Sequence, residues 1–175
     1  MDDDATDDTA TDDPVQERVG DRLREREETL AVAESCTGGL VGSKLTDVPG
    51  SSDYFDRSLV TYSYAAKQEL LAVSRESLDA HGAVSEAVAA EMAQGVRDTA
   101  GTDWGVATTG VAGPGGGTDA TPVGTVYIAV AEAAPWETNE SGVTVSHHEF
   151  DGDRLEIKAR IATQALSALE TALRE

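Results

Sequence analysis

Ser35 lies between an expected strand and an expected helix, a position at which a serine can act as a catalytic nucleophile. It lies in the segment AESCTGG, residues 33–39, which joins an apolar stretch to the start of an expected helix. In open α/β sheets ligands bind beyond the carboxyl ends of strands, where helix N-termini present free N–H groups. Thr37 is a candidate helix cap, and Gly38 and Gly39 allow a ligand or another backbone to come close. Ser35 is therefore a candidate nucleophile, and the alternative is a polar turn residue.

Cys36 is a second candidate nucleophile in the same segment. No histidine lies within ten residues of it in the sequence, and a small buried cysteine is the more common outcome. It is the only cysteine of the chain, which excludes an intramolecular disulfide framework and favours a reducing, cytoplasmic compartment.

Lys67 is a candidate general base. It closes the segment VTYSYAAK, residues 60–67, which again runs from an expected strand into an expected helix. Burial, or a neighbouring cation, lets a lysine act as a base near neutral pH. A nearby tyrosine hydroxyl could then relay the proton of Ser35 to Lys67. The alternative is an ordinary exposed lysine.

A glycine-rich segment and an arginine are candidate anion-binding elements. The segment TTGVAGPGGG, residues 108–117, can wrap its amides around an anion, although it lacks the ending of a nucleotide P-loop. A long flexible connection is the alternative. Arg154 stands in the first turn of an expected helix, where a cation is electrostatically misplaced unless an anion binds. A salt bridge to Asp151 is the alternative.

The sequence gives little support to a metal site. His81, His147 and His148 form no His-x-x-x-His pair, and Cys36 has no cysteine partner. His147 and His148 are adjacent and would point to opposite faces of a strand. We expect no metal and no cofactor.

The elements that would position these residues alternate along the chain. Helices are expected over residues 14–28, 37–45, 65–71, 85–99 and 153–174, and strands over 29–34, 57–64, 104–110, 124–132 and 142–150. This alternation predicts an α/β protein with three α/β/α layers. Polar residues alternate with others over 142–150, which predicts a half-exposed edge strand.

The chain length suits one domain. It has 175 residues, of which 39% are hydrophobic and only 5% aromatic, so small apolar residues must build the core. We expect an acidic tail over residues 1–13, which is too poor in apolar residues to fold alone, and one domain over 14–175. No apolar run approaches the roughly 18 residues that a membrane span requires.

The net charge of −20 restricts the partners. The first 13 residues hold seven aspartates and no basic residue, so the other 162 still carry −13. Such a field repels phosphate backbones, which argues against general nucleic-acid binding. An acidic surface with only three lysines also suggests a halophilic source, because high salt screens its self-repulsion.

Several motifs together resemble the CinA C-terminal domain family, whose stand-alone members include nicotinamide-nucleotide amidases of the PncC type. The resemblance covers about residues 15–173. It rests on the segments AESCTGG from residue 33, VTYS from 60 with Ala66-Lys67, HGAVS from 81, TGVAGP from 109, PVGT from 122 and DGDR from 151. The family implies a mixed, mostly parallel five-stranded sheet within the α/β/α layers.

The resemblance also implies an activity, hydrolysis of the carboxamide of nicotinamide mononucleotide to nicotinate mononucleotide and ammonia. Ser35 then looks like the nucleophile, Tyr62 and Lys67 like the proton-handling pair, and Thr109 like a further site hydroxyl. The amides of the following turn would stabilise the oxyanion, and the glycine loop with Arg154 would hold phosphate and ribose. The oxyanion residues are Cys36, Thr37, Gly38 and Gly39; the loop glycines are Gly110, Gly113, Gly115 and Gly116.

Two positions depart from the family's pattern, and two other functions stay open. Tyr64 stands where many relatives have Asn, which changes the pocket wall, and Thr121 stands where many have Lys.

A non-catalytic nucleotide-binding module would keep the glycine loop and Arg154 without bringing Ser35 to Lys67. A scaffold acting through its acidic surface would have no small-molecule pocket. We expect a small nucleotide as substrate, no nucleic-acid or membrane partner, and a homo-oligomer.

Overall fold

The computed structural model describes residues 13–175, so the expected acidic tail lies outside the described residues except for Asp13. The helices are α1 (Val15–Arg26), α2 (Leu40–Thr46), α3 (Tyr64–Leu71), α4 (Arg75–His81), α5 (Glu86–Ala100) and α6 (Arg154–Ala172). The strands are β1 (Leu30–Glu34), β2 (Phe55–Val60), β3 (Trp104–Gly110), β4 (Thr125–Glu132) and β5 (Gly142–Glu149), and a short 3-10 helix covers Ser51–Asp53.

The strands form one mixed sheet in the order β2-β1-β3-β4-β5. β1 pairs in parallel with both β2 and β3, whereas β4 pairs antiparallel with β3 and β5. Only β4 therefore runs against the other four strands. The carboxyl ends of β1, β2, β3 and β5 consequently meet at one edge of the sheet, together with the beginning of β4.

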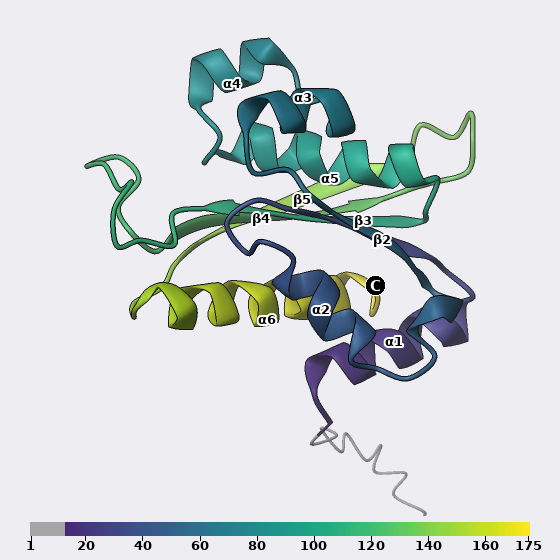
Figure 1. The fold of residues 1–175 in the computed structure, drawn as a ribbon. Coiled ribbons are helices and arrows are strands. Elements are labelled where there is room, and N and C mark those ends of the chain that lie inside the picture. Colours follow the sequence, from purple (N-terminus) through teal and green to yellow (C-terminus); the bar gives the residue numbers. More distant parts are fainter. Residues whose placement is uncertain (1–12) are drawn as a thin grey trace, which may run out of the picture.

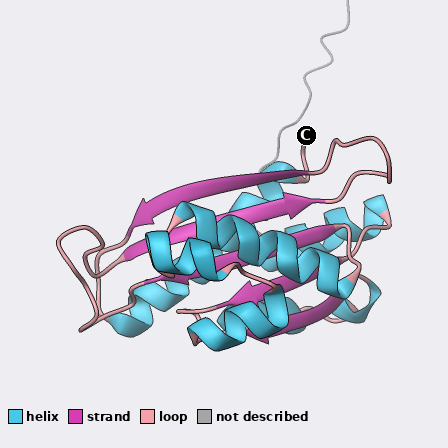
Figure 2. Ribbon diagram, turned by 90° about the horizontal axis from the view of Figure 1, so that it is seen from above, coloured by secondary structure: helices cyan, strands magenta, loops and turns pink. Residues whose placement is uncertain are grey.

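Helices cover both faces of the sheet (Figure 1). α1, α2 and α6 lie on one face, and α3, α4 and α5 lie on the other, where Figure 2 shows them in front of the strands. This arrangement confirms the three-layer α/β/α fold.

Residues of β1 alternate between the two cores. Leu30 and Val32 pack into the core beneath α1, α2 and α6, whereas Ala31 and Ala33 face α5. By the same alternation, the next two side chains, Glu34 and Ser35, point to opposite layers. Small residues on the second face, such as Gly105 of β3, let α5 pack closely, since a Cβ there would lie 2.2 Å from a carbonyl of that helix.

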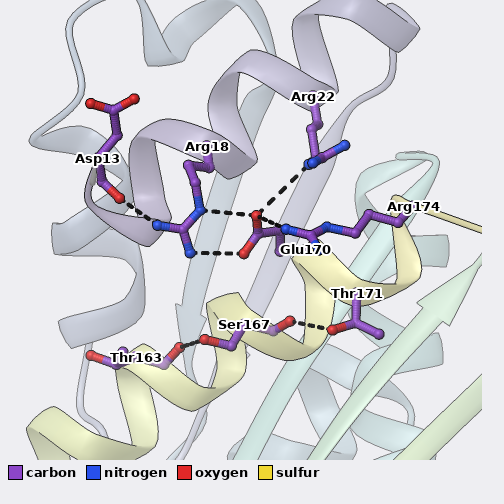
Figure 3. A network of polar contacts seen from close by, with 8 residues as sticks. All are labelled: Asp13, Arg18, Arg22, Thr163, Ser167, Glu170, Thr171 and Arg174. Atoms are coloured by element: carbon purple, nitrogen blue, oxygen red, sulfur yellow. Dashed lines mark hydrogen bonds and ion pairs between the residues drawn. The ribbon is translucent and has the colours of Figure 1, made fainter. Parts of the chain in front are cut away.

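A buried carboxylate joins the two helices at the ends of the described chain. Glu170 of α6 accepts two hydrogen bonds of 2.9 Å from Arg18 of α1 and one of 2.9 Å from Arg174, while Arg22 lies 3.8 Å away (Figure 3). These arginines lower the pKa of Glu170 to about 2, chiefly through the hydrogen bonds from Arg18.

Three elements differ from the sequence expectation. The strand expected over 57–64 ends at Val60, because Ser63 caps α3 by accepting from the N–H of Ala66. Residues 75–81 form the unexpected helix α4, capped by Ser74. The helix expected from Thr37 begins only at Leu40, because the preceding residues form a turn held by Glu34.

Candidate active site

A pocket of about 260 Å³ opens at the edge where the strand ends meet. It is bounded by the turn after β1, the segment after β2, the loop between α4 and α5, the glycine loop after β3 and the first turn of α6. The lining residues are Ser35, Cys36, Tyr62, Ala83, Val84, Thr109, Gly110, Val111, Ala112, Gly113, Gly115, Gly116 and Arg154. The pocket thus gathers most of the residues that the sequence singled out.

Ser35 and Lys67 are in direct contact at this pocket. The Nζ atom of Lys67 lies 2.9 Å from the Oγ atom of Ser35 and donates to the carbonyl oxygen of Thr61 at 2.6 Å. The side chain of Lys67 is fully buried, so the alternative of an exposed lysine is wrong. A binding module would not need this contact.

Burial prepares Lys67 to act as a base. Removing an ammonium group from water disfavours its charged form, and this desolvation lowers the pKa of Lys67 from 10.5 to about 8. Near neutral pH a useful fraction of Lys67 is therefore neutral. A neutral amine can donate to Thr61 and still offer its lone pair to the proton of Ser35.

Cys36 is poorly suited to be the nucleophile. Burial raises the pKa of its thiol to about 12, so almost none of the reactive thiolate is present near neutral pH. Of the two candidates in this turn, only Ser35 contacts a base.

The turn that carries Ser35 is anchored by Glu34. Its buried carboxylate accepts hydrogen bonds from the backbone N–H groups of Gly39, Val41 and Gly42 at 2.8–3.1 Å and from the hydroxyl of Ser58 at 2.8 Å. Glu34 was not predicted from the sequence as a site residue. A charged residue at the end of an apolar strand was the signal available.

The same turn revises the expected oxyanion donors. The N–H of Gly39 is held by Glu34 and that of Gly38 donates to the carbonyl of Ser35 at 3.2 Å, so neither is free for a substrate. Among residues 13–175 no acceptor is found for the N–H of Cys36 or Thr37. The hydroxyl of Thr37 bonds Thr108 at 2.8 Å and does not cap α2.

Tyr62 does not lie between Ser35 and Lys67, as a proton relay would require. Its side chain is 64% exposed, and its hydroxyl lies 3.5 Å from the Nη2 atom of Arg154. Lys67 contacts Ser35 without an intermediary, so the geometry does not support a relay through Tyr62. The reason is that the chain leaves the sheet at Val60, which carries Tyr62 outward while α3 brings Lys67 back under the pocket.

Arg154 also binds the glycine loop. Its Nη1 atom donates to the carbonyl oxygen of Gly113. No carboxylate lies within ion-pair distance of Arg154 in the part of the chain that is described, so the alternative of a salt bridge to Asp151 is wrong. Gly113 itself has φ +79°, and a Cβ there would lie 2.5 Å from Val123, so only glycine fits. The guanidinium is available to an anion entering the pocket.

Thr109 is buried and its hydroxyl already has an acceptor. It donates to the carbonyl oxygen of Ala83 at 2.7 Å, across the pocket wall. Because a hydroxyl carries one proton, Thr109 can accept from a substrate but has none left to donate. The wall segment itself, residues 83–84, was not singled out as part of a site from the sequence.

Residues 13–175 contain neither a metal-binding cluster nor a helix that could span a membrane. No three His, Cys, Asp or Glu side chains there are grouped so as to hold a metal ion. None of the described helices has both the length and the apolar character that crossing a membrane would need.

A comparison with protein families places the chain in one of them. The model of the CinA C-terminal domain matches residues 12–173, nearly the whole chain. The chain belongs to the CinA C-terminal domain family. The family's fold therefore accounts for the convergence of the strand ends on the Ser35 pocket.

Curated relatives of this CinA-type domain are much longer than the chain. A CinA-like protein of Chlorobaculum tepidum is 51% identical over 163 residues, which cover 92% of this chain and 38% of the relative. A CinA-like protein of Salinibacter ruber is 49% identical over 148 residues, covering 85% and 34%. The chain thus spans little more than a third of these proteins.

Solved structures of CinA-type proteins share the fold over most of their length. The competence damage-inducible protein A (ComA) of Klebsiella pneumoniae superposes with a TM-score of 0.85 at 34% identity, covering 93% of this chain and 99% of that one. The competence/damage inducible protein CihA of Agrobacterium tumefaciens gives 0.82 at 37%, covering 92% and 94%. The names of these two proteins refer to competence and damage and to no reaction.

Proposed function

We propose that this CinA-type domain hydrolyses the carboxamide of nicotinamide mononucleotide, giving nicotinate mononucleotide and ammonia. The observation that carries the proposal is the 2.9 Å contact between Ser35, which lines the pocket, and the buried Lys67. A serine that can lose its proton to a neighbouring neutral amine is a nucleophile for acyl transfer. The substrate itself comes from the resemblance of the motifs.

The reaction would proceed in two acyl-transfer steps. Neutral Lys67 takes the proton of Ser35 while the serine oxygen bonds to the amide carbon. The free N–H groups of Cys36 and Thr37 are the candidate donors to the oxyanion. Lys67 returns the proton to the leaving nitrogen, the C–N bond breaks and ammonia departs. Water then attacks the serine ester while Lys67 accepts a proton from it. Lys67 passes this proton to the serine oxygen as the ester bond breaks, which frees Ser35, and the product acid ionises to the carboxylate by losing its proton to solvent.

The mouth of the pocket supports recognition of the phosphate and ribose. Arg154 has no carboxylate partner among the described residues and projects from the first turn of α6 beside Tyr62 and the glycine loop. A guanidinium binds phosphate with high geometric specificity. We assign it the phosphate, and the loop glycines Gly110, Gly113, Gly115 and Gly116 the ribose and phosphate together.

The test is ammonia release from nicotinamide mononucleotide in molar KCl. We expect release by the wild type and a loss of at least about 1000-fold in Ser35→Ala, because the covalent route is removed. Ser43→Ala is the matched control, since Ser43 is an exposed serine on the neighbouring helix α2 and lies outside the pocket. Its rate should equal that of the wild type.

Two outcomes would overturn the proposal. Undiminished release by Ser35→Ala would remove the nucleophile. Binding of the nucleotide by folded wild type without ammonia release would identify a nucleotide-binding module instead.

The location that fits this metabolite chemistry and the free Cys36 is the cytoplasm. The homo-oligomer that we propose is checked by light scattering in the same buffer.

A further inference from the structure

Both backbone polar groups of Ala83 are held by side chains. Its N–H donates to the hydroxyl of Tyr64 at 3.2 Å, and its carbonyl oxygen accepts from the hydroxyl of Thr109 at 2.7 Å. Tyr64 begins α3 and Thr109 lies near the end of β3, so two separate elements hold the two successive peptide groups on either side of Ala83, in the loop between α4 and α5.

The peptide that joins Gly82 to Ala83 is also held through its carbonyl oxygen. The hydroxyl of Ser85, the cap of α5, donates to the carbonyl oxygen of Gly82 at 2.9 Å. The loop has no regular structure, and side chains rather than a backbone ladder fix its position. A wall of this kind moves when its few hydrogen bonds are lost.

This loop forms part of the pocket that holds Ser35. Ala83 and Val84 both line it, whereas Tyr64 does not. At about 260 Å³ the pocket is at the small end of the range for ligand sites, so a bound substrate would contact this wall. A small displacement of the wall would therefore change how tightly such a ring is held against Ser35.

We propose that Tyr64 and Thr109 are positioning residues that clamp the backbone on both sides of Ala83 and so set the fit of the substrate's ring in the pocket. This inference rests on the proposed amidase function. Thr109 lines the pocket and can accept from a substrate, but its one proton goes to Ala83, and we assign its effect on substrate fit to that bond. Tyr64 acts from outside the pocket, so its effect on the substrate passes through the wall alone.

Steady-state kinetics with nicotinamide mononucleotide tests the role in substrate fit. Tyr64→Phe and Thr109→Val should each raise KM about 3- to 10-fold and change kcat by less than about 2-fold, because they weaken binding and leave the Ser35–Lys67 contact in place. Thr109→Ser keeps a hydroxyl and should bring KM back toward the wild-type value.

Two substitutions of the same type serve as controls. Tyr127→Phe removes a tyrosine hydroxyl from β4, where the ring stacks on His147 outside the pocket. Thr171→Val removes a hydroxyl that donates to a backbone carbonyl within α6. Neither should change KM. A loss of kcat above about 10-fold in Thr109→Val with an unchanged KM would make Thr109 a catalytic residue and overturn the clamp.

Hydrogen exchange of the Ala83 amide tests the clamp without any substrate. Tyr64→Phe removes the acceptor of this amide, so NMR should show exchange about 10-fold faster at Ala83, with no change in Tyr127→Phe. Equal exchange in Tyr64→Phe and wild type would overturn the inference. If the wild type releases no ammonia, the proposed function fails by itself, and this exchange measurement still decides whether the clamp exists.

Discussion

Lys67 combines full burial with a hydrogen bond to Ser35, and this combination links activity to pH. Its pKa is lowered to about 8 by desolvation, and only its neutral form accepts the proton of Ser35. We predict that kcat/KM rises with pH through an apparent pKa near 8 and levels off above it. Initial rates between about pH 6 and 9.5 measure this. A profile that is flat or falls over this range would contradict the role of Lys67.

The burial of Lys67 also affects stability. Because its folded-state pKa lies below the unfolded value of 10.5, the charged form destabilises the fold below about pH 8, and this penalty is relieved as pH rises from about 8 to 10.5. We predict that Lys67→Met has no amidase activity and is about 1–3 kcal/mol more stable at pH 7. Urea unfolding at pH 7 and 10 should show this advantage shrinking at the higher pH. A Lys67→Met protein that is less stable than the wild type at pH 7 would contradict this prediction.

At the scale of elements, the turn between β1 and α2 depends on one carboxylate. Glu34 accepts from three backbone N–H groups and from Ser58, and every donor faces an acceptor-only group. In Glu34→Gln one oxygen becomes an NH₂ group that opposes these donors. We predict a loss of about 1–3 kcal/mol of stability and at least about 10-fold in kcat, because the turn also carries Ser35.

Glu91→Gln is the matched control for this prediction. Glu91 of α5 likewise accepts from a backbone N–H, that of Ser74, and from the hydroxyls of Ser74 and Ser77, but it lies outside the pocket. It should lose stability and keep kcat. Thermal unfolding and ammonia release on both variants separate the two effects, and equal kcat losses would show that Glu34 has no specific link to Ser35.

At the scale of the whole molecule, Glu170 ties α1 to α6. Its pKa is lowered to about 2 by Arg18 and Arg174, so its stabilisation is complete above about pH 4.5 and is lost as pH falls from there toward 2. We predict that Glu170→Gln is about 2–3 kcal/mol less stable than wild type at pH 7 and that the difference disappears near pH 2. Urea unfolding at pH 7, 4 and 3 measures this. A difference independent of pH would refute it.

The net charge of −20 predicts a dependence on salt. Self-repulsion of the acidic surface is screened by mobile ions, so we propose a protein adapted to high salt. The melting temperature should rise by about 5 °C or more between 0.1 and 2 M KCl. Sucrose at matched osmolality is the control, because it does not screen charge. A melting temperature unchanged by KCl would count against a halophilic source.

The sequence by itself determined the layers, most of the elements and the edge of the sheet at which the candidate site lies. Periodicity predicted β3 with its observed bounds and β5 as a half-exposed edge strand. Ser35 and Arg154 were predicted because one follows a strand and the other begins a helix, and these ends meet at one edge, whereas Thr109 was predicted from the resemblance of the motifs. Local patterns carry this information because periodicity and capping depend on near neighbours.

Only the tertiary structure decided which of these residues touch. Ser35 meets Lys67 across 32 positions, and Arg154 meets Gly113 across 41, because strand order and the alternation of side chains between faces place them together. The same arrangement buried Lys67, gave Glu34 its donors and turned Tyr62 toward Arg154. Desolvation and long-range hydrogen bonds arise from packing, which is why residue spacing alone did not supply them.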